Sequence, residues 1–212
     1  MAILKEKGTF RPIDETFLAQ SLDVFQGVSD IQAQYNKGDT DTFMNEVRDS
    51  IAAKYLGYTH INIDKHGFDA RRTKQDGEYE FLEVKTASFD ADTWGATFND
   101  TNQDKADAFK SNSVYLCLSV WRYASDPVFF AYGQNPEIGV FLEDKMKNRP
   151  LGSRSTQSIS LQNLVNTYGF KIYSISKTPE QIYNILQLKK GCRNISLEAI
   201  ECISSRSYVY NY

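Results

Sequence analysis

The sequence predicts an α/β fold with a central mixed β-sheet flanked by helices. Two patterns predict this class: apolar residues recur every three or four positions in several segments, and they alternate or run together in short segments between them. The 212 residues are 41% hydrophobic and 24% charged. This composition is typical of one folded domain, or of one domain with a modest appendage, with enough apolar residues for a full core.

The first third of the chain predicts two helices and then three strands. The second helix follows cap residues at 38–41 and ends before Gly57. A tight turn at Gln75-Asp76-Gly77 separates the last two strands, which predicts a hairpin. The helices are expected over residues 14–35 and 41–56, and the strands over 58–63, 68–73 and 79–86.

The rest of the chain predicts a further helix over 102–112 and then an almost wholly apolar segment over 114–121. Such a run is expected of a strand that is covered on both faces of a sheet. A polar loop without hydrophobic period occupies residues 148–158. Further strands are expected over 128–132, 138–142 and 170–176, and a last helix from the cap at Thr178 to about Leu188.

The net charge of −3 hides an asymmetry along the chain. Residues 1–144 contain 14 Lys and Arg against 24 Asp and Glu, a balance of −10, whereas residues 145–212 contain 10 against 3, a balance of +7. An acidic body followed by a basic segment indicates two roles in one chain. No apolar run approaches the roughly 20 residues that span a bilayer, and no secretory signal begins the sequence, so we expect a cytoplasmic protein without membrane contact.

Three residues of the predicted hairpin form the main candidate for a chemical site. Glu83 and Lys85 are two positions apart on a strand, so their side chains emerge on the same face. Asp69 lies thirteen intervening residues before Glu83, at the start of the adjoining strand, where its carboxylate can approach that of Glu83. Two carboxylates beside a lysine fit a Mg²⁺-dependent phosphodiesterase, because Mg²⁺ prefers oxygen ligands and keeps several waters. The lysine can then orient or deprotonate a water, or stabilise the developing charge.

This pattern resembles the PD-(D/E)XK nuclease superfamily, and especially the type II restriction endonucleases, over residues 41–132. The order helix, three strands, helix, strand is also that family's core, so the resemblance implies a restriction-endonuclease-like fold. It further implies that Asp69 and Glu83 are the metal ligands for Mg²⁺ and that Lys85 is the family's lysine. The family's proline before the first acid is replaced here by Phe68. The resemblance also points to Glu46, on the helix before the sheet, as an acid near the metal.

Several alternatives to this assignment stay open at the level of sequence. Asp64, in a predicted turn, competes with Asp69 for the first acid position. The histidines His60 and His66 have the chemistry of a general base or a zinc ligand, but their spacing is not the i, i+4 of a helical zinc pair. Glu83 and Lys85 also fit the exposed face of an ordinary amphipathic strand.

The resemblance implies double-stranded DNA as the substrate and a homodimer as the assembly, because two-fold symmetric dimers read palindromic sites. Residues 1–144 would then be the catalytic nuclease core with its N-terminal helices. Residues 145–212 would serve DNA recognition or dimerisation, packed on the same domain. The expected DNA contacts are polar, aromatic or basic side chains after the lysine strand and in the basic segment: Trp94, Asn99, Gln103, Lys105, Arg149, Arg154 and Gln157.

The leading interpretation is a sequence-specific endonuclease that uses Mg²⁺ and leaves 5′-phosphates. A second interpretation keeps the nuclease fold but makes the substrate branched or damaged DNA, as in repair and recombination. A third is a non-catalytic α/β nucleic-acid-binding module in which the acids and the lysine are structural. Carboxylate-dependent Mg²⁺ binding distinguishes the third interpretation from the first two.

Overall fold

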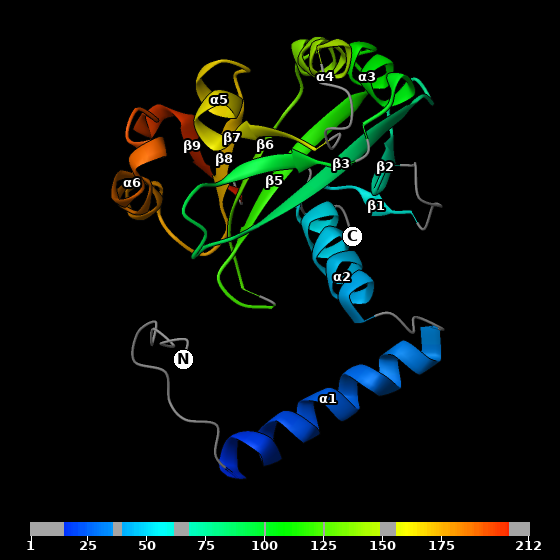
Figure 1. Cartoon of the computed structure of the whole chain (residues 1–212), viewed down its shortest axis with the longest axis vertical. Coiled ribbons are helices and arrows are strands. Elements are labelled where there is room, and N and C mark those ends of the chain that lie inside the picture. Colours follow the sequence, from blue (N-terminus) through cyan, green and yellow to red (C-terminus); the bar gives the residue numbers. More distant parts are fainter. Residues whose placement is uncertain are drawn as a thin grey trace, which may run out of the picture. The chain divides into compact units, whose positions relative to one another are not determined.

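The computed structural model describes residues 15–35, 40–61, 68–99, 101–124, 126–148 and 156–203 (Figure 1). The chain divides into two compact units, residues 1–44 and residues 45–212. No helix within the described ranges is both long enough and apolar enough to cross a membrane.

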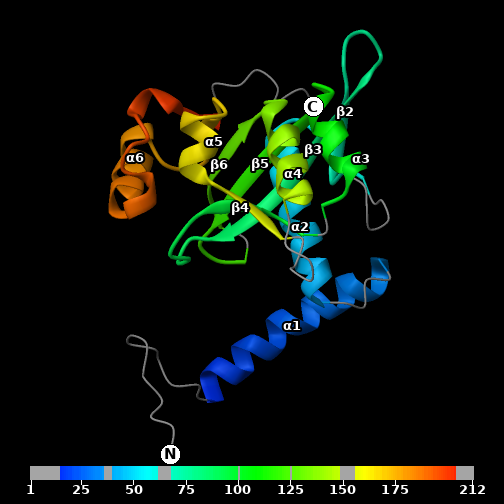
Figure 2. The same cartoon turned by 45° about the horizontal axis from the view of Figure 1, so that its top comes forward.

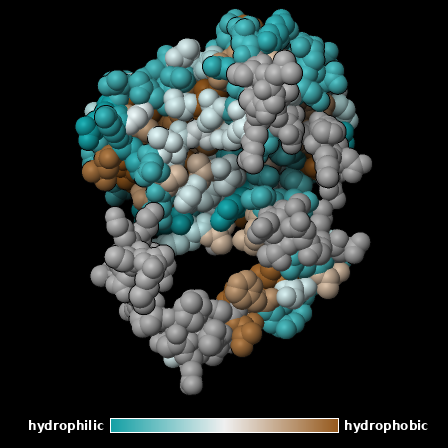
Figure 3. All heavy atoms as spheres, in the orientation of Figure 1, coloured by the Kyte–Doolittle hydropathy of each residue, from teal (hydrophilic) through white to brown (hydrophobic). Residues whose placement is uncertain are grey.

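The first unit contains helix α1 (Glu15–Tyr35), which confirms the helix predicted over residues 14–35. The side chains of Leu22, Val24, Phe25 and Ile31 are exposed on this helix. Brown apolar surface is visible over the region of α1 in Figure 3. The first unit therefore exposes several large apolar side chains along α1.

A seven-stranded mixed sheet forms the centre of the second unit (Figures 1 and 2). Strands β3 and β5 are parallel, as are β8 and β9, and the other neighbouring pairs are antiparallel. The sheet confirms the predicted class, an α/β protein with a mixed central sheet and flanking helices. In sheet order the strands are β1 (Thr59–His60), β2 (Ala70–Thr73), β3 (Tyr79–Ser88), β5 (Val114–Trp121), β6 (Pro127–Gly133), β8 (Lys171–Ser174) and β9 (Ile200–Cys202).

Both faces of the sheet are covered, as the apolar run over residues 114–121 predicts. Along β5, Leu116 and Leu118 belong to one core and Cys117 to the other, because successive side chains alternate between faces. Helix α2 (Thr40–Tyr55) packs Ala52 and Ala53 into the second core, together with residues of β3. Gly57, at φ 76°, ends the turn after this helix in the left-handed conformation that glycine adopts without strain.

The remaining helices contribute to the first core. They are α3 (Gln103–Lys110), α4 (Glu137–Lys147), α5 (Leu161–Asn166) and α6 (Pro179–Leu188). A capping box formed by Thr178 and Gln181 begins α6, which confirms the start predicted from the sequence. A separate two-stranded antiparallel sheet pairs β4 (Gly95–Phe98) with β7 (Gln157–Ser160).

The basic segment from residue 145 onward supplies two strands of the central sheet. Strand β8 pairs with β6, and β9 pairs with β8. The chain divides into its two compact units between residues 44 and 45. The change of charge at residue 144 is therefore not a boundary between these units.

One predicted strand was wrong. Residues 138–142 lie in helix α4, whose buried side chains Ile138 and Leu142 are one helical turn apart and face the core. A run of five mostly apolar residues fits a buried strand or a helix equally well. In the structure the run belongs to a longer helix, which continues through charged residues to Lys147. Strands β4, β7 and β9 and helix α5 were not predicted. Of the strand expected over 58–63, the structure contains Thr59–His60, and residues 62–67 lie outside the described ranges.

Helices α3 and α4 lie side by side in both views (Figure 2). A methyl group at Gly139 would lie 2.4 Å from the carbonyl oxygen of Ala106 and 2.9 Å from the backbone nitrogen of Lys110. Because these are backbone atoms, Gly139→Ala should force the helices apart and lower the free energy of unfolding by about 2 kcal/mol. Urea denaturation measures this loss.

The control for this substitution is Gly191→Ala, since a methyl group there meets no atom within 4 Å. We expect Gly191→Ala to leave the denaturation midpoint close to that of the wild type. Equal stability of the two variants would contradict the described packing of α3 on α4.

Candidate active site

The β2–β3 hairpin places Asp69 beside Glu83. The antiparallel register ends where Ala70 pairs with Leu82, so Asp69, the residue before β2, lies beside the segment of β3 that contains Glu83. The Asp69 amide donates a hydrogen bond to the Leu82 carbonyl at 2.9 Å, and the Val84 amide donates to Asp69 Oδ2 at 2.6 Å. The backbone of β3 thus fixes the Asp69 carboxylate next to the Glu83 carboxylate.

Glu83 is a buried carboxylate at the centre of an ion-pair cluster. Its side chain is 2% exposed, and Lys85 Nζ and Lys105 Nζ lie 2.5 Å and 2.6 Å from the same oxygen, Oε1. The other oxygen, Oε2, is buried and accepts no hydrogen bond from any described residue. A buried carboxylate oxygen without a donor is unusual, and it has the chemistry to accept a hydrogen bond or to contact a cation.

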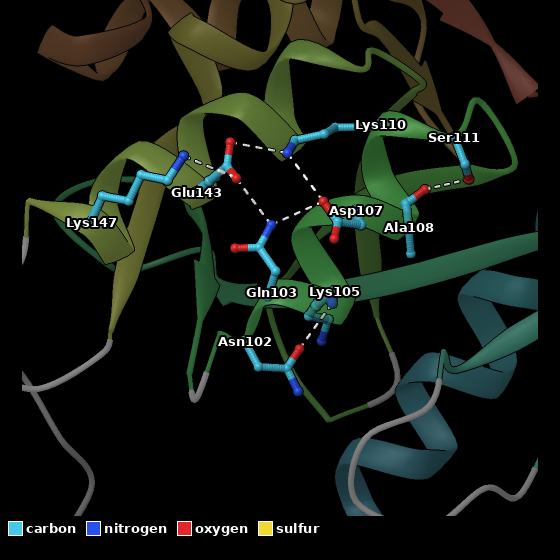
Figure 4. Close-up of polar contacts among 9 residues, drawn as sticks. All are labelled: Asn102, Gln103, Lys105, Asp107, Ala108, Lys110, Ser111, Glu143 and Lys147. Carbon is cyan, nitrogen blue, oxygen red and sulfur yellow. Dashed lines mark hydrogen bonds and ion pairs between the residues drawn. The ribbon is translucent and has the colours of Figure 1, made fainter.

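Lys105 reaches Glu83 from the first turn of helix α3. The Asn102 side chain caps this helix by accepting a hydrogen bond from the Lys105 amide at 2.9 Å (Figure 4). The cap therefore fixes the backbone of Lys105 where the helix begins. Lys85 comes from β3 itself, so the two lysines approach Glu83 from different elements.

Asp49, on helix α2, is a member of the cluster that the sequence analysis missed. The pKa of Asp49 is raised from 3.8 to about 8, mainly by burial and next by the charge of Asp69. The charge of Lys85 opposes this rise, and the charges of Glu83 and Glu46 add to it. Glu46, the acid proposed for this helix, lies one turn before Asp49 and so acts on the same cluster. The spacing i, i+3 from Glu46 was the available signal for Asp49.

The neighbouring charges also shift the pKa values of Asp69 and Lys85. The pKa of Asp69 is raised to about 6, mainly by burial and next by the charge of Glu83, whereas the Val84 amide and the two lysines lower it. Burial alone lowers the pKa of Lys85, but the charge and hydrogen bond of Glu83 and the charges of Asp69 and Asp49 raise it above its ordinary value. Lys85 is therefore a protonated ammonium in the metal-free protein.

The raised pKa of Asp49 predicts that the metal-free protein becomes less stable as pH rises from about 4 to about 8. In that interval the folded state binds more protons than the unfolded state, so the free energy of unfolding falls with pH. Asp49→Asn removes this ionisation and should raise the free energy of unfolding at pH 8 by on the order of 3 kcal/mol. Urea denaturation at pH 5 and pH 8 in EDTA measures the effect.

Asp76→Asn is the matched control, because Asp76 is exposed at the hairpin turn. It should keep the pH dependence of the wild type. Asp69 leaves a smaller dependence below about pH 6 in every variant that retains it. An Asp49→Asn protein whose stability falls between pH 5 and pH 8 as steeply as that of the wild type would contradict the burial of Asp49 among acids.

The residues present fit a Mg²⁺ ion bound between Asp69 and Glu83. Mg²⁺ sites use one or two carboxylates, with waters and substrate phosphate as the other ligands. Glu83 Oε2 has no donor, and Asp69 Oδ1 accepts no hydrogen bond from any described residue. Within the part of the chain that the structure describes, no three His, Cys, Asp or Glu side chains converge as a metal centre. The protein ligands that the described residues offer to Mg²⁺ are therefore the carboxylates of Asp69 and Glu83.

The residues expected to contact DNA lie in different parts of the structure. Trp94 is 2% exposed, and its indole nitrogen donates to the Ser88 and Phe89 carbonyls at 3.1 Å and 3.3 Å. Its side chain therefore belongs to the core and has no face for a nucleic acid. Asn99 and Gln157 come together at one end of the β4–β7 sheet, where Gln157 pairs with Phe98. Arg149 and Arg154 lie outside the described residues.

Gln103 takes part in a polar network that joins α3 to α4 (Figure 4). Its amide nitrogen donates to Asp107 at 2.9 Å and to Glu143 at 3.0 Å. Glu143 also pairs with Lys110 at 3.0 Å and with Lys147 at 3.1 Å. These contacts give Gln103 a structural role between the helices, whereas Lys105 is the residue of this turn that reaches the carboxylate cluster.

The alternatives for the first acid and for a histidine site are only partly described. Asp64 and His66 fall within residues 62–67, outside the described ranges, and His60 lies in β1. Among the acids that the structure describes, Asp69 is the one whose backbone and carboxylate both bond to the Glu83 strand.

Comparison with known protein families and with curated proteins identifies no relative of this chain. The chain matches no known protein-family profile, and no curated protein is significantly similar to it.

Proposed function

We propose that this protein is a Mg²⁺-dependent DNA endonuclease. The observation that carries the proposal is the buried Glu83, which lies beside Asp69 and is contacted by Lys85 and Lys105, with one carboxylate oxygen left without a donor. A buried acid pair with lysines at its opening is costly to fold and is expected where a cation and an anionic substrate meet. Its position on the rigid strands of a central sheet suits a catalytic site.

The chain's own residues divide the work of phosphodiester hydrolysis. Asp69 and Glu83 would hold the metal ion, which when bound would neutralise a phosphate and lower the pKa of a coordinated water. Lys85 carries a proton on Nζ, because its pKa is raised by the surrounding acids, so it acts as a donor to a phosphate oxygen. Of the roles open to this lysine, stabilisation of the developing negative charge is therefore favoured over removal of a proton from water.

We extend the proposal to a sequence-specific enzyme of the type II restriction class, which acts on double-stranded DNA as a homodimer and leaves 5′-phosphates. Support comes from the hairpin site and from the balance of +7 over residues 145–212, which suits a polyanionic partner. The pairing of β4 with β7 brings polar residues from both halves of the chain, Asn99 and Gln157, to one end of the small sheet. Amide side chains of this kind read base edges.

Incubation with a panel of plasmid DNAs and Mg²⁺ tests the proposal. We expect discrete fragments from the wild type, none from Asp69→Asn, and the wild-type pattern from the control Asp76→Asn, which makes the same change at the exposed end of the hairpin. Failure to cut any DNA, or cleavage that Asp69→Asn leaves unchanged, would contradict the proposal. Cleavage of four-way junctions in preference to linear duplex would assign the same site to a structure-selective nuclease.

A further inference from the structure

Two lysines share one oxygen of Glu83 while the second oxygen has no donor. Lys85 Nζ and Lys105 Nζ both lie against Oε1, at 2.5 Å and 2.6 Å, and their side chains are 21% and 19% exposed. Oε1 therefore pairs with two ammonium groups, whereas Oε2 is buried and has no hydrogen-bond partner among the described residues. A divalent cation on Oε2 would be placed beside these ammonium groups, with little water between them to screen the repulsion.

The two lysines differ in what else holds them. The charge of Asp69 acts on both lysines. Lys85 is also on the same strand as Glu83, the charge of Asp49 acts on it, and its ammonium lies 5.5 Å from the centre of the Phe98 ring. Lys105 comes from α3, and within the described ranges Glu83 is its one ion-pair partner. Lys105 is therefore the lysine that can leave with the smaller loss of contacts.

We propose that Lys105 is an internal counter-ion, which pairs with Glu83 in the metal-free protein and which a divalent cation must displace to bind. This inference rests on the proposed metal site at Asp69 and Glu83. The Asn102 side chain holds the Lys105 backbone in the first turn of α3, so the displaced ammonium remains beside the site. A lysine released there supplies a positive charge to a substrate phosphate, and metal binding thereby prepares the site for DNA.

Calorimetric titration with Mg²⁺, in the absence of DNA, tests the inference on the full chain. Lys105→Gln should bind Mg²⁺ about tenfold more tightly than the wild type, which is within the range over which outer residues change metal affinity. Lys110→Gln is the matched control, because Lys110 is on the same helix and pairs with Asp107 and Glu143, outside the site. It should bind Mg²⁺ as the wild type does.

Equal or weaker Mg²⁺ affinity in Lys105→Gln, relative to the wild type, would overturn the inference and leave the proposed function standing. If neither the wild type nor Lys105→Gln binds Mg²⁺, both the inference and the proposed function are contradicted. The two experiments' outcomes therefore distinguish failure of the inference alone from failure of the proposed function. Lys105→Arg serves if the Gln variant does not fold. A guanidinium can hold both carboxylate oxygens, so Lys105→Arg should bind Mg²⁺ more weakly than the wild type, and unchanged or tighter binding would overturn the inference.

Discussion

Glu83→Gln should reduce Mg²⁺-dependent DNA cleavage by about a thousandfold or more, because it removes the charge of a metal ligand at the reacting phosphate. The same change leaves Lys85 and Lys105 without their carboxylate partner in a largely buried site. We therefore expect a loss of about 2–3 kcal/mol in the free energy of unfolding, somewhat below the cost of breaking a fully buried pair, since both lysines retain some solvent contact. Single-turnover cleavage and urea denaturation measure the two effects.

Glu143→Gln is a closely matched control for this substitution. Glu143 also pairs with two lysines, Lys110 and Lys147, but it lies between α3 and α4 with 21% of its side chain exposed. Its replacement should lower the free energy of unfolding much less than Glu83→Gln does, and it should leave cleavage unchanged. A Glu83→Gln enzyme that cuts DNA at the wild-type rate would exclude Glu83 as a metal ligand.

Lys85→Met should reduce the single-turnover rate of cleavage by about a hundredfold to a thousandfold while Mg²⁺ binding persists. The substitution keeps most of the side-chain length and removes the ammonium that we assign to the developing phosphate charge. Because Lys85 also pairs with Glu83 Oε1, its removal should not weaken Mg²⁺ binding and is expected to strengthen it. Calorimetric titration of the same preparation with Mg²⁺ shows whether a lower cleavage rate is accompanied by weaker Mg²⁺ binding.

The separation of these two effects distinguishes catalysis from folding. A Lys85→Met protein that loses Mg²⁺ binding together with cleavage would show that Lys85 holds the site together and does not act on the phosphate. A protein that retains both would remove Lys85 from the mechanism. Lys85→Arg, which keeps the charge, should recover part of the rate.

The hairpin and its acid pair could be predicted because their signals are local. Residues two apart on a strand share a face, and the turn at 75–77, with Gly77 at φ 88°, sets the pairing that places Asp69 beside the segment of β3 that contains Glu83. The apolar run over 114–121 likewise showed that one strand is buried on both faces.

Residues brought in by tertiary packing could not be placed in the same way. Asp49 joins the cluster because α2 packs on the sheet, and its one local signal is the i, i+3 spacing from Glu46. Lys105 reaches Glu83 because α3 begins beside β3, and this contact has no local pattern. The pairing of β4 with β7 joins residues about 60 positions apart, so it was missed for the same reason. Trp94 looked like a surface aromatic after the lysine strand, but its indole nitrogen finds carbonyl partners within the core.

Crystals grown with Mn²⁺, a Mg²⁺ substitute with an anomalous signal, test the central claim most directly. The account predicts an anomalous difference peak at bonding distance from an oxygen of Asp69 and an oxygen of Glu83, with the Lys105 ammonium moved away from Glu83. A map without a peak between these carboxylates, in which Lys85 and Lys105 still pair with Glu83 at saturating Mn²⁺, would contradict it.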